Sequence, residues 1–423
     1  MRYQIITVGS ELTLGLSVDT NAAFISKMLG KHGFTCVRQV SVPDKIDLIA
    51  EAITESLAQA DGVIITGGLG PTIDDLTRDA IGRALGRELE YQERLAHIIE
   101  ERYGNRAIPL PEITYRQAYL PRGAEAIIPT IGSAPGIIIN DEDEKFLFSL
   151  PGVPREMADM LEKSVVPWLE ARFCRGVAHA VRVLRTTAKS EASLQEAIED
   201  LVRSLREVDI GILAYPGEIQ LQLLAKGADL DEAKATAGNA ETLLKERLGN
   251  IIYGYDDETL EEVTGKLLLK HGLSLAVAES CTGGLVGKKL TDIAGSSEYF
   301  SGGIIAYNND AKRTLLNVSS QTLVRHGAVS AATALAMAFG VRDRFNADVG
   351  LSITGIAGPG GGTDEKPVGL VYIALSHRVT NFSNRFVFFG SRDTVRIKSA
   401  NAALDMLRYY ILDNFERAGG DAS

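Results

Sequence analysis

The beginning of the chain alternates short apolar segments with segments that have helical spacing. Apolar runs occupy residues 3–8 (YQIITV) and 62–65 (GVII), with strand-like spacing at 34–40 and helical spacing at 20–32 and 45–59. Strands that alternate with helices predict a parallel sheet with crossover helices. Ligands of such sheets bind at the carboxyl ends of the strands, so the loops after residues 8 and 65 are candidate sites.

Charge and composition exclude several classes of function. The net charge is −11 and no long basic run occurs, so the sequence does not predict nucleic-acid binding. Cys36, Cys174 and Cys281 are widely separated and form no zinc pattern, which is typical of a reducing compartment. Without a signal peptide or an apolar stretch of about 18 residues, we expect a cytoplasmic protein that does not enter the membrane.

The length of 423 residues predicts two or three domains at about 150 residues each. We expect an α/β domain over 1–172, a small α+β module over 175–253 and a second α/β domain over 257–420. A hairpin-like turn, Tyr215-Pro216-Gly217, interrupts the middle part. Because this part has no dense polar cluster, we assign it a spacer or interface role.

The first candidate site is the segment TGGLGPTIDD, which follows the apolar run at 62–65 and precedes a helix. Glycines let a ligand approach the backbone, and the start of a helix offers free amides to an anion. The adjacent carboxylates of Asp74 and Asp75 could take Mg²⁺, which prefers oxygen ligands and substrate phosphate. The alternative is a tight turn with an aspartate helix cap.

A second group of polar residues follows the first apolar run. Glu11 and Asp19 could line the same crevice as the aspartate pair. The alternative is again helix capping, because Asp19, Thr20 and Asn21 are all good caps.

Ser280 is the best candidate for a nucleophile. It follows an apolar run at 273–278 and precedes Thr282-Gly283-Gly284, where a helix is expected to begin. A hydroxyl on such a turn is exposed and lies near amides that can stabilise an oxyanion. Cys281 is a rival nucleophile, but it is more simply a small residue packed behind the loop.

The base for this serine is sought in the segment YNNDAK at 307–312, because His271 and His326 lie in no polar cluster. A partly desolvated lysine can replace histidine, which favours Lys312, and Tyr307 could relay the proton. An ion pair with Asp310 would raise the pKa of Lys312, so we expect Asp310 to point elsewhere.

A glycine-rich segment, TGIAGPGGG at 354–362, offers backbone amides for a phosphate. The alternative is a surface loop. Arg392 and Arg396 lie one turn apart on a predicted helix and could add positive charge for the phosphate, although such pairs more often form a solvated face.

The motifs of the N-terminal part resemble the N-terminal domain of the competence/damage-inducible CinA family, which is similar to molybdopterin-binding proteins of the MoaB and MogA type. The matching segments are GSELTLG, DTN, TGGLGPTIDDLTRDA, SAPG and LPGVPREM. The resemblance implies hydrolysis of ADP-ribose with a divalent metal such as Mg²⁺. It places the nucleotide on Gly67, Gly68, Gly70, Thr72 and Asn21, and the metal on Asp75 with Asp74, Glu11 or Asp19.

The C-terminal part is similar to the CinA C-terminal domain, whose stand-alone form is the nicotinamide-nucleotide amidase PncC. The matching segments are AESCTGG, GGIIAYNNDAK, RHGAVS and TGIAGPGGG, with Asn308 and Asp310 where serine and glutamate are usual. The resemblance implies hydrolysis of nicotinamide mononucleotide to nicotinic acid mononucleotide and ammonia, with no cofactor. Ser280 would be the nucleophile and Tyr307 and Lys312 its proton-transfer partners. The substrate-binding residues would be Thr282, Gly283, Gly284, Asn309, Thr354, Gly355, Gly358, Arg392 and Arg396.

The middle part resembles the KH-like segment of long CinA proteins. It shows no GXXG clamp loop and the chain is acidic, so we do not expect RNA binding. The resemblance implies a homodimer. The alternative for the N-terminal domain is a pterin- or nucleotide-binding module without turnover, in a competence-related protein.

Overall fold

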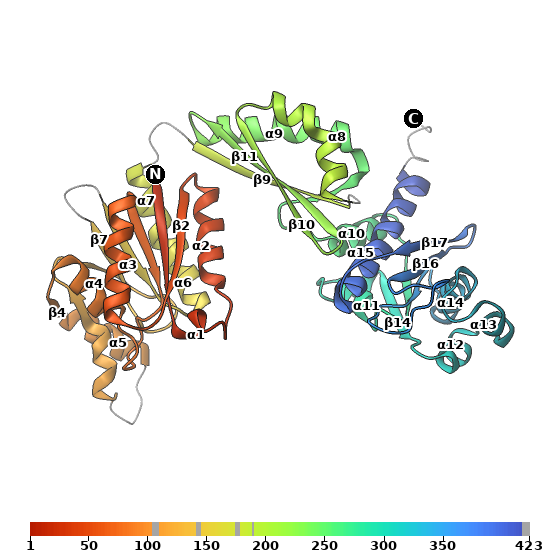
Figure 1. Ribbon diagram of the computed structural model, residues 1–423, viewed down its shortest axis with the longest axis horizontal. Coiled ribbons are helices and arrows are strands. Elements are labelled where there is room, and N and C mark those ends of the chain that lie inside the picture. The colour runs from red at the N-terminus through yellow and green to blue at the C-terminus, as the bar shows by residue number, and fades with distance from the viewer. Residues whose placement is uncertain (104–109, 141–144, 174–177, 188–189, 417–423) are drawn as a thin grey trace. The chain divides into compact units, whose positions relative to one another are not determined.

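The computed structural model describes residues 1–103, 110–140, 145–173, 178–187 and 190–416. The chain forms two compact units, one of residues 1–181 with 225–237 and the other of 182–224 with 238 onward (Figure 1). Both units are α/β, as predicted. Cys174 and the expected boundaries at 175 and 420 lie outside the described residues.

The first unit contains a six-stranded sheet in the order β2-β1-β3-β8-β7-β6. Its strands are β1 (Arg2–Val8), β2 (Thr35–Val42), β3 (Gly62–Thr66), β6 (Glu125–Ile127), β7 (Gly136–Asn140) and β8 (Phe146–Leu150). Strands β2, β1, β3 and β8 are parallel to one another, whereas β7 pairs antiparallel with both β8 and β6. The predicted parallel sheet is therefore correct for four strands, and the full sheet is mixed.

Helices cover both faces of this sheet. They are α1 (Ser10–Thr13), α2 (Thr20–Lys31), α3 (Ile46–Gln59), α4 (Thr77–Leu85), α5 (Glu93–Tyr103), α6 (Pro154–Met160) and α7 (Val166–Phe173), with a small ribbon of β4 (Leu89–Tyr91) and β5 (Tyr119–Pro121). Successive strand residues face opposite sides, so Ile6 packs in a cluster with Ile49 of α3, and Ile5 packs in another with Ile25 of α2.

The middle part of the chain, which we call the central module, forms a four-stranded sheet in the order β10-β11-β9-β12. Its elements are β9 (Ala178–Thr186), α8 (Glu191–Ser204), β10 (Val208–Tyr215), β11 (Glu218–Gly227), α9 (Leu230–Leu248) and β12 (Ile252–Tyr255). Alternate residues of β11, from Ile219 to Ala225, are buried. This period of two is expected of a sheet that is covered on one face.

The C-terminal module, residues 257–416, contains a five-stranded sheet in the order β14-β13-β15-β16-β17. The strands are β13 (Leu275–Glu279), β14 (Phe300–Ile305), β15 (Val349–Gly355), β16 (Leu370–Ser376) and β17 (Asn381–Val387). Strands β14, β13 and β15 are parallel to one another, and β16 pairs antiparallel with both β15 and β17. The carboxyl ends of the three parallel strands meet at one edge, which brings Ser280, Tyr307 and the end of β15 together.

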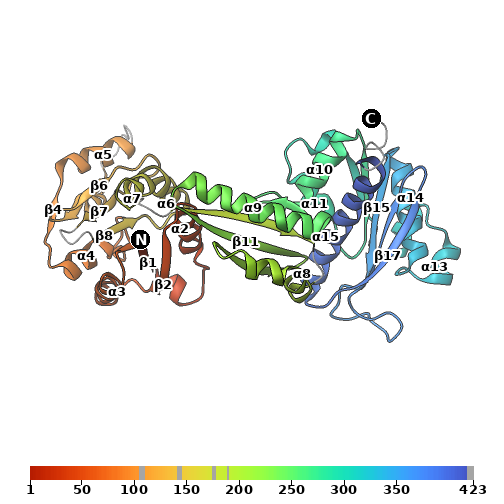
Figure 2. The same ribbon diagram turned by 90° about the horizontal axis from the view of Figure 1, so that it is seen from above.

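Helices again cover both faces of this sheet (Figure 2). They are α10 (Leu260–Lys270), α11 (Leu285–Thr291), α12 (Asn309–Leu316), α13 (Ser320–His326), α14 (Ala331–Phe345) and α15 (Arg392–Ile411). One core includes Leu268 of α10, Val286 of α11 and Leu404 of α15, and the opposite core includes Leu316 of α12 and Met337 of α14. Among the described residues, no helix is long and apolar enough to cross a membrane.

Candidate functional site

The turn that carries Ser280 follows a strand that is buried throughout. Strand β13 lies between β14 and β15, and the Ser280 amide donates to the carbonyl of Ile353 at 3.0 Å. The turn closes where the Gly283 amide donates to the Ser280 carbonyl at 3.2 Å. Gly283 and Gly284 have φ values of 61° and 94°, a region that favours glycine over residues with a Cβ. The chain therefore reverses sharply after the serine and enters α11.

Lys312 lies directly beside this serine. Its Nζ donates to Ser280 Oγ at 2.9 Å and to the carbonyl oxygen of Ala306 at 2.8 Å. The side chain of Lys312 is 1% exposed, and burial lowers the pKa of its ammonium group. Desolvation disfavours the charged form, so this amine can accept a proton from Ser280. Asp310 instead pairs with Arg313 at 3.1 Å, as expected.

Glu279, at the end of β13, is a residue of the site that sequence reasoning missed. It is 2% exposed. Its carboxylate accepts from the amides of Gly284, Val286 and Gly287 at 2.9, 3.2 and 2.8 Å. An anion at the start of a helix is stabilised by unpaired amides. A single charged residue that ends an otherwise apolar strand, LAVAE, was the available signal.

Glu279 changes which amides are free to stabilise an oxyanion. We expected the amides from Thr282 to Gly284 to do so, but the Gly284 amide is engaged by Glu279 and the Gly283 amide by the Ser280 carbonyl. In the described part of the chain, the amides of Cys281 and Thr282 donate to no oxygen atom, although both lie near the Cys281 sulfur. The Thr282 hydroxyl is also buried and lacks a partner there. The free donors therefore come from the two residues after the serine.

The thiol of Cys281 is poorly suited to nucleophilic attack. The residue is 6% exposed and packs in the main core of the C-terminal module. Burial raises the pKa of Cys281 to about 12. Because the thiolate is the reactive form, this environment favours Ser280 as the nucleophile.

The two arginines of α15 hold loops of the site together. Arg392 donates to the Gly358 carbonyl at 2.7 Å and to the Tyr307 hydroxyl at 2.8 Å. Arg396 donates to the Thr282 carbonyl, at 2.9 Å from Nη2 and 3.3 Å from Nε. Tyr307, 61% exposed, therefore points its hydroxyl at Arg392, and only its carbonyl approaches Lys312 Nζ, at 3.5 Å. In this arrangement the Tyr307 hydroxyl is not placed to pass a proton between Ser280 and Lys312, as the expected relay requires.

The remaining predicted pocket residues lie around the same edge. Thr354 is fully buried, and its hydroxyl donates to the Ala328 carbonyl at 2.8 Å, so it holds the RHGAVS segment against the end of β15. Gly355 ends β15. Asn309 is exposed at the start of α12, and Asn308 caps that helix by accepting from the Ala311 amide at 2.7 Å. The unusual Asn308 thus has a structural role.

In the first unit, the TGGLGPTIDD loop is organised around Asp75. Its carboxylate accepts from the Gly70 and Thr72 amides, each at 2.8 Å, and from the Thr72 hydroxyl. Asp74 accepts from the same hydroxyl. The Gly70 and Thr72 amides, which were expected to bind a diphosphate, thus donate to the Asp75 carboxylate instead.

Arg78 of α4 holds this loop through hydrogen bonds to its backbone, a role that the sequence did not predict. It is 3% exposed, and its guanidinium donates to the carbonyls of Leu69 and Gly70 at 2.7 and 2.6 Å. Gly67 comes so close to the end of β1 that an added Cβ would collide with the Val8 carbonyl, and one on Gly68 would collide with Thr77. These two glycines are therefore required by close packing.

The four carboxylates expected to bind metal are not gathered into one site. Asp19 caps α2 by accepting from the Ala22 amide at 2.9 Å, and the Glu11 carboxylate lies over Gly9. Over the described residues, no three His, Cys, Asp or Glu side chains form a group that could hold a metal ion. The residues present therefore do not fit a metal held by protein side chains alone. Asn21 does reach the loop region, donating to Thr66 Oγ1 and the Gly152 carbonyl at 3.0 and 2.8 Å.

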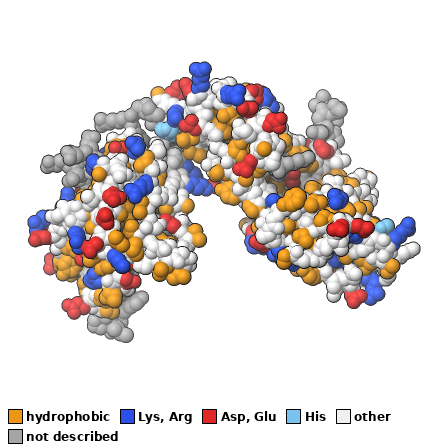
Figure 3. All heavy atoms as spheres, viewed as in Figure 1, with side chains coloured by type: hydrophobic (Ala, Val, Ile, Leu, Met, Phe, Trp, Pro, Cys, Tyr) orange, Lys and Arg blue, Asp and Glu red, His pale blue; other side chains and the backbone are white. Residues whose placement is uncertain are grey.

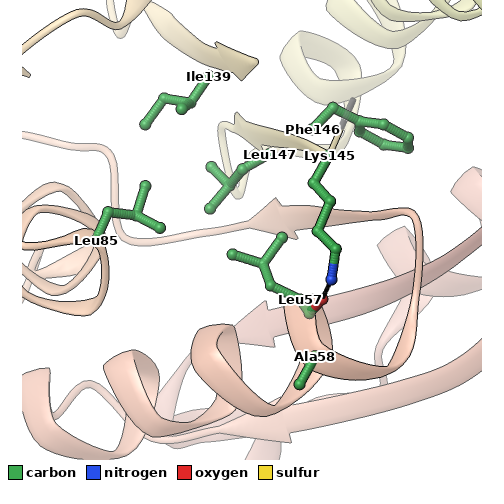
Figure 4. A pocket seen from close by; sticks show the side chains of 7 residues that line it. All are labelled: Leu57, Ala58, Leu85, Ile139, Lys145, Phe146 and Leu147. Atoms are coloured by element: carbon green, nitrogen blue, oxygen red, sulfur yellow. Dashed lines mark hydrogen bonds between the residues drawn. The ribbon is translucent and has the colours of Figure 1, made fainter. Parts of the chain in front are cut away.

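A cavity of about 250 Å³ lies elsewhere in the first unit (Figure 4). Its lining is mainly apolar and comprises Leu57, Ala58, Leu85, Ile139, Lys145, Phe146 and Leu147, with the Lys145 ammonium donating to the Leu57 carbonyl. Residues 145–147 lie where β8 begins, at the opposite end from the TGGLGPTIDD loop. This cavity is therefore separate from the predicted crevice.

Charged side chains of both signs are interspersed on the face shown in Figure 3. Among the described residues on that face, Lys and Arg form no broad basic surface.

Three family models match successive parts of the chain. The "CinA C-terminal domain" matches residues 257–411, the "Probable molybdopterin binding domain" residues 4–171, and the "Damage-inducible protein CinA KH domain" residues 181–254. Relatives from Moorella thermoacetica and Caldicellulosiruptor bescii, each called "Putative competence-damage inducible protein", are each 41% identical to this chain. They align with 96% and 98% of this chain, and with 98% and 100% of their own. The crystal structure of the competence/damage inducible protein CihA from Agrobacterium tumefaciens is 41% identical over 36% of this chain and 96% of its own, with a TM-score of 0.35.

Proposed function

This chain belongs to the CinA family, and from that premise we propose that its C-terminal module hydrolyses the carboxamide of nicotinamide mononucleotide. The products would be nicotinic acid mononucleotide and ammonia. The observation that carries the proposal is the buried pair of Ser280 Oγ and Lys312 Nζ, 2.9 Å apart. A neutral lysine beside a serine hydroxyl is a known way to activate that hydroxyl for acyl transfer.

In the first step, Lys312 takes the proton of the Ser280 hydroxyl while Oγ attacks the carboxamide carbon. The carbonyl oxygen becomes an oxyanion, which the free amides of Cys281 and Thr282 stabilise by donating hydrogen bonds. Glu279 supports this step indirectly, because its three hydrogen bonds fix the start of α11 behind those two amides.

In the second step, the bond between the carbonyl carbon and the nitrogen breaks. Protonated Lys312 gives its proton to the leaving amide nitrogen, which departs as ammonia and leaves an ester on Ser280. Water then attacks the ester with Lys312 as general base, the carboxylate product leaves and the serine regains its proton. One water is consumed, and we propose that the cycle needs no metal or other cofactor.

The remaining predicted residues would bind the substrate around this pair. Arg392 and Arg396 carry positive charge at the carboxyl edge of the sheet, and the segment from Thr354 to Gly358 borders the same edge. A phosphate near either guanidinium would gain charge-assisted hydrogen bonds. Tyr307 is exposed beside Arg392, where its ring can contact the substrate.

The test is ammonia release from nicotinamide mononucleotide in the presence of EDTA. Ser280→Ala should lower the rate by a factor on the order of 10³ or more, and Lys312→Met by about 10² to 10⁴. Matched controls are Ser301→Ala, at an exposed position at the start of β14, and Lys270→Met, at an exposed position on α10. Full activity of Ser280→Ala would overturn the proposal, and inhibition of the wild type by EDTA would remove its metal-free part.

For the first unit we propose a nucleotide site at the carboxyl ends of β1 and β3, with hydrolysis of ADP-ribose as its reaction. The support is the glycine-rich loop that directly follows β3 and the Asn21 link to Gly152. The alternative is a pterin- or nucleotide-binding module, which the match to a molybdopterin-binding model favours. ADP-ribose turnover with added divalent metal would support the enzyme, and tight pterin binding without turnover would support the alternative.

A further inference from the structure

Helix α15 connects the catalytic loops to the central module. Its first five residues include Arg392 and Arg396, which donate to the carbonyls of Gly358 and Thr282 and to the hydroxyl of Tyr307. These groups lie on the three loops that follow β15, β13 and β14. The position of α15 therefore sets how these loops sit relative to one another.

The opposite side of the same helix contacts the central module. Asn401 donates to the carbonyls of Pro216 and Gly217 at 3.4 and 3.3 Å. Arg408 is 2% exposed and donates to the Asn250 carbonyl at 2.7 Å, with Asp405 as its charge partner at 2.7 Å. At 3.6 residues per turn, positions 401 and 408 lie about 160° to 180° around the helix from position 392.

Burial along α15 agrees with packing on two sides. From Ser399 to Ile411 the buried residues, both polar and apolar, cover more than half of the helix circumference, and positions 402, 405 and 409 on the remaining stripe are half-buried. A helix on a protein surface, in contrast, buries only one stripe. Figure 2 shows α15 between the five-stranded sheet and the central module. The contact at Gly217 is close, because an added Cβ would lie 3.0 Å from Asn401 Nδ2 and 3.3 Å from Lys398 Cα.

We infer that the central module positions the C-terminal site. Its 215–217 turn and Asn250 hold α15, so that Arg396 fixes the nucleophile turn, residues 280–284, and Arg392 fixes the loops after β14 and β15. This assigns a role to a segment that the sequence marked only as a spacer or interface. The inference rests on the proposed amidase function for its kinetic consequence, but its structural part is independent of that reaction. Asn401 and Arg408 are positioning residues, since they act on the site through α15.

The experiment compares Gly217→Ala with Gly272→Ala in the full chain. Both glycines have positive φ, 77° and 60°, so both substitutions strain the backbone. Only the first places a methyl group against α15, because nothing lies within 4 Å of a Cβ on Gly272. Asn401→Ala, which removes the hydrogen bonds without adding bulk, serves as a milder second variant.

Two readouts separate this inference from the proposed function. Hydrogen exchange of the peptide containing residues 280–287 should become faster in Gly217→Ala but not in Gly272→Ala, whatever the substrate is. With nicotinamide mononucleotide, kcat should fall about 10- to 100-fold in Gly217→Ala only, because small displacements of reacting groups are costly, and less in Asn401→Ala. Equal exchange and equal kcat in the two glycine variants would overturn the inference. Absence of ammonia release by the wild type would overturn the amidase proposal instead, and the exchange result would then decide the inference alone.

Discussion

The replacement of Glu279 by glutamine tests how the nucleophile turn is held. The carboxylate accepts from two amides through Oε2, those of Gly284 and Val286, and from the Gly287 amide through Oε1. In the best orientation of the glutamine side chain, its oxygen replaces Oε2 and its amino group faces the Gly287 amide. One donor then meets another donor, and a buried amide left without an acceptor costs about 1–3 kcal/mol.

Hydrogen exchange of the amides at 284–287 measures this cost directly. Because about 1.4 kcal/mol corresponds to a tenfold change in an equilibrium constant, local opening should become about 5- to 150-fold more frequent. The control is Glu261→Gln on α10, another buried carboxylate, which accepts from the Lys289 side chain at 2.9 Å. Unchanged protection at 284–287 in Glu279→Gln, or equal loss in the control, would refute this reasoning.

Three further predictions concern the reacting groups. Lys312→Met should stabilise the protein most at low pH: burial lowers the pKa of Lys312, so the folded wild type carries the cost of a buried ammonium below that pKa and loses it as pH rises toward the ordinary lysine range. Chemical denaturation at several pH values checks this, and a gain that grew with pH would contradict it. Cys281→Ala should keep kcat within about threefold, because at a pKa of about 12 almost no thiolate exists near pH 7; loss of turnover would reinstate the thiol. Tyr307→Phe should leave kcat nearly unchanged and raise KM, because its hydroxyl contacts Arg392; a fall in kcat with unchanged KM would restore the relay.

The sequence was sufficient to predict the α/β class and the positions of Ser280 and Lys312 because these depend on local patterns. Apolar runs followed by glycines mark strands that end in loops, and three of these loops meet at one edge of the C-terminal sheet. It did not predict the antiparallel pairing of β6, β7, β16 and β17, since strand direction depends on how distant segments pair. The match of family models to both ends of the chain agrees with the predicted kinship.

Details of the site depended on hydrogen bonds that no residue pattern reveals. Glu279 takes amides that were expected to face the substrate, and Asp75 does the same in the first unit. Arg396 binds a backbone carbonyl in its own chain. In each case a charged side chain satisfies backbone groups of a tight loop, because burial makes unpaired amides and carbonyls costly. The metal ligands and the dimer remain predictions.

The central claim is that Ser280 becomes acylated, and mass spectrometry of enzyme quenched during turnover tests it most directly. The Cys281→Ala variant should be used, so that no thiol competes with the Ser280 hydroxyl in the turn. With nicotinamide mononucleotide, we predict that the peptide containing Ser280 gains the mass of the substrate less ammonia, and that Ser280→Ala shows no such gain. Turnover without any acylated peptide, or acylation at another residue, would contradict the account.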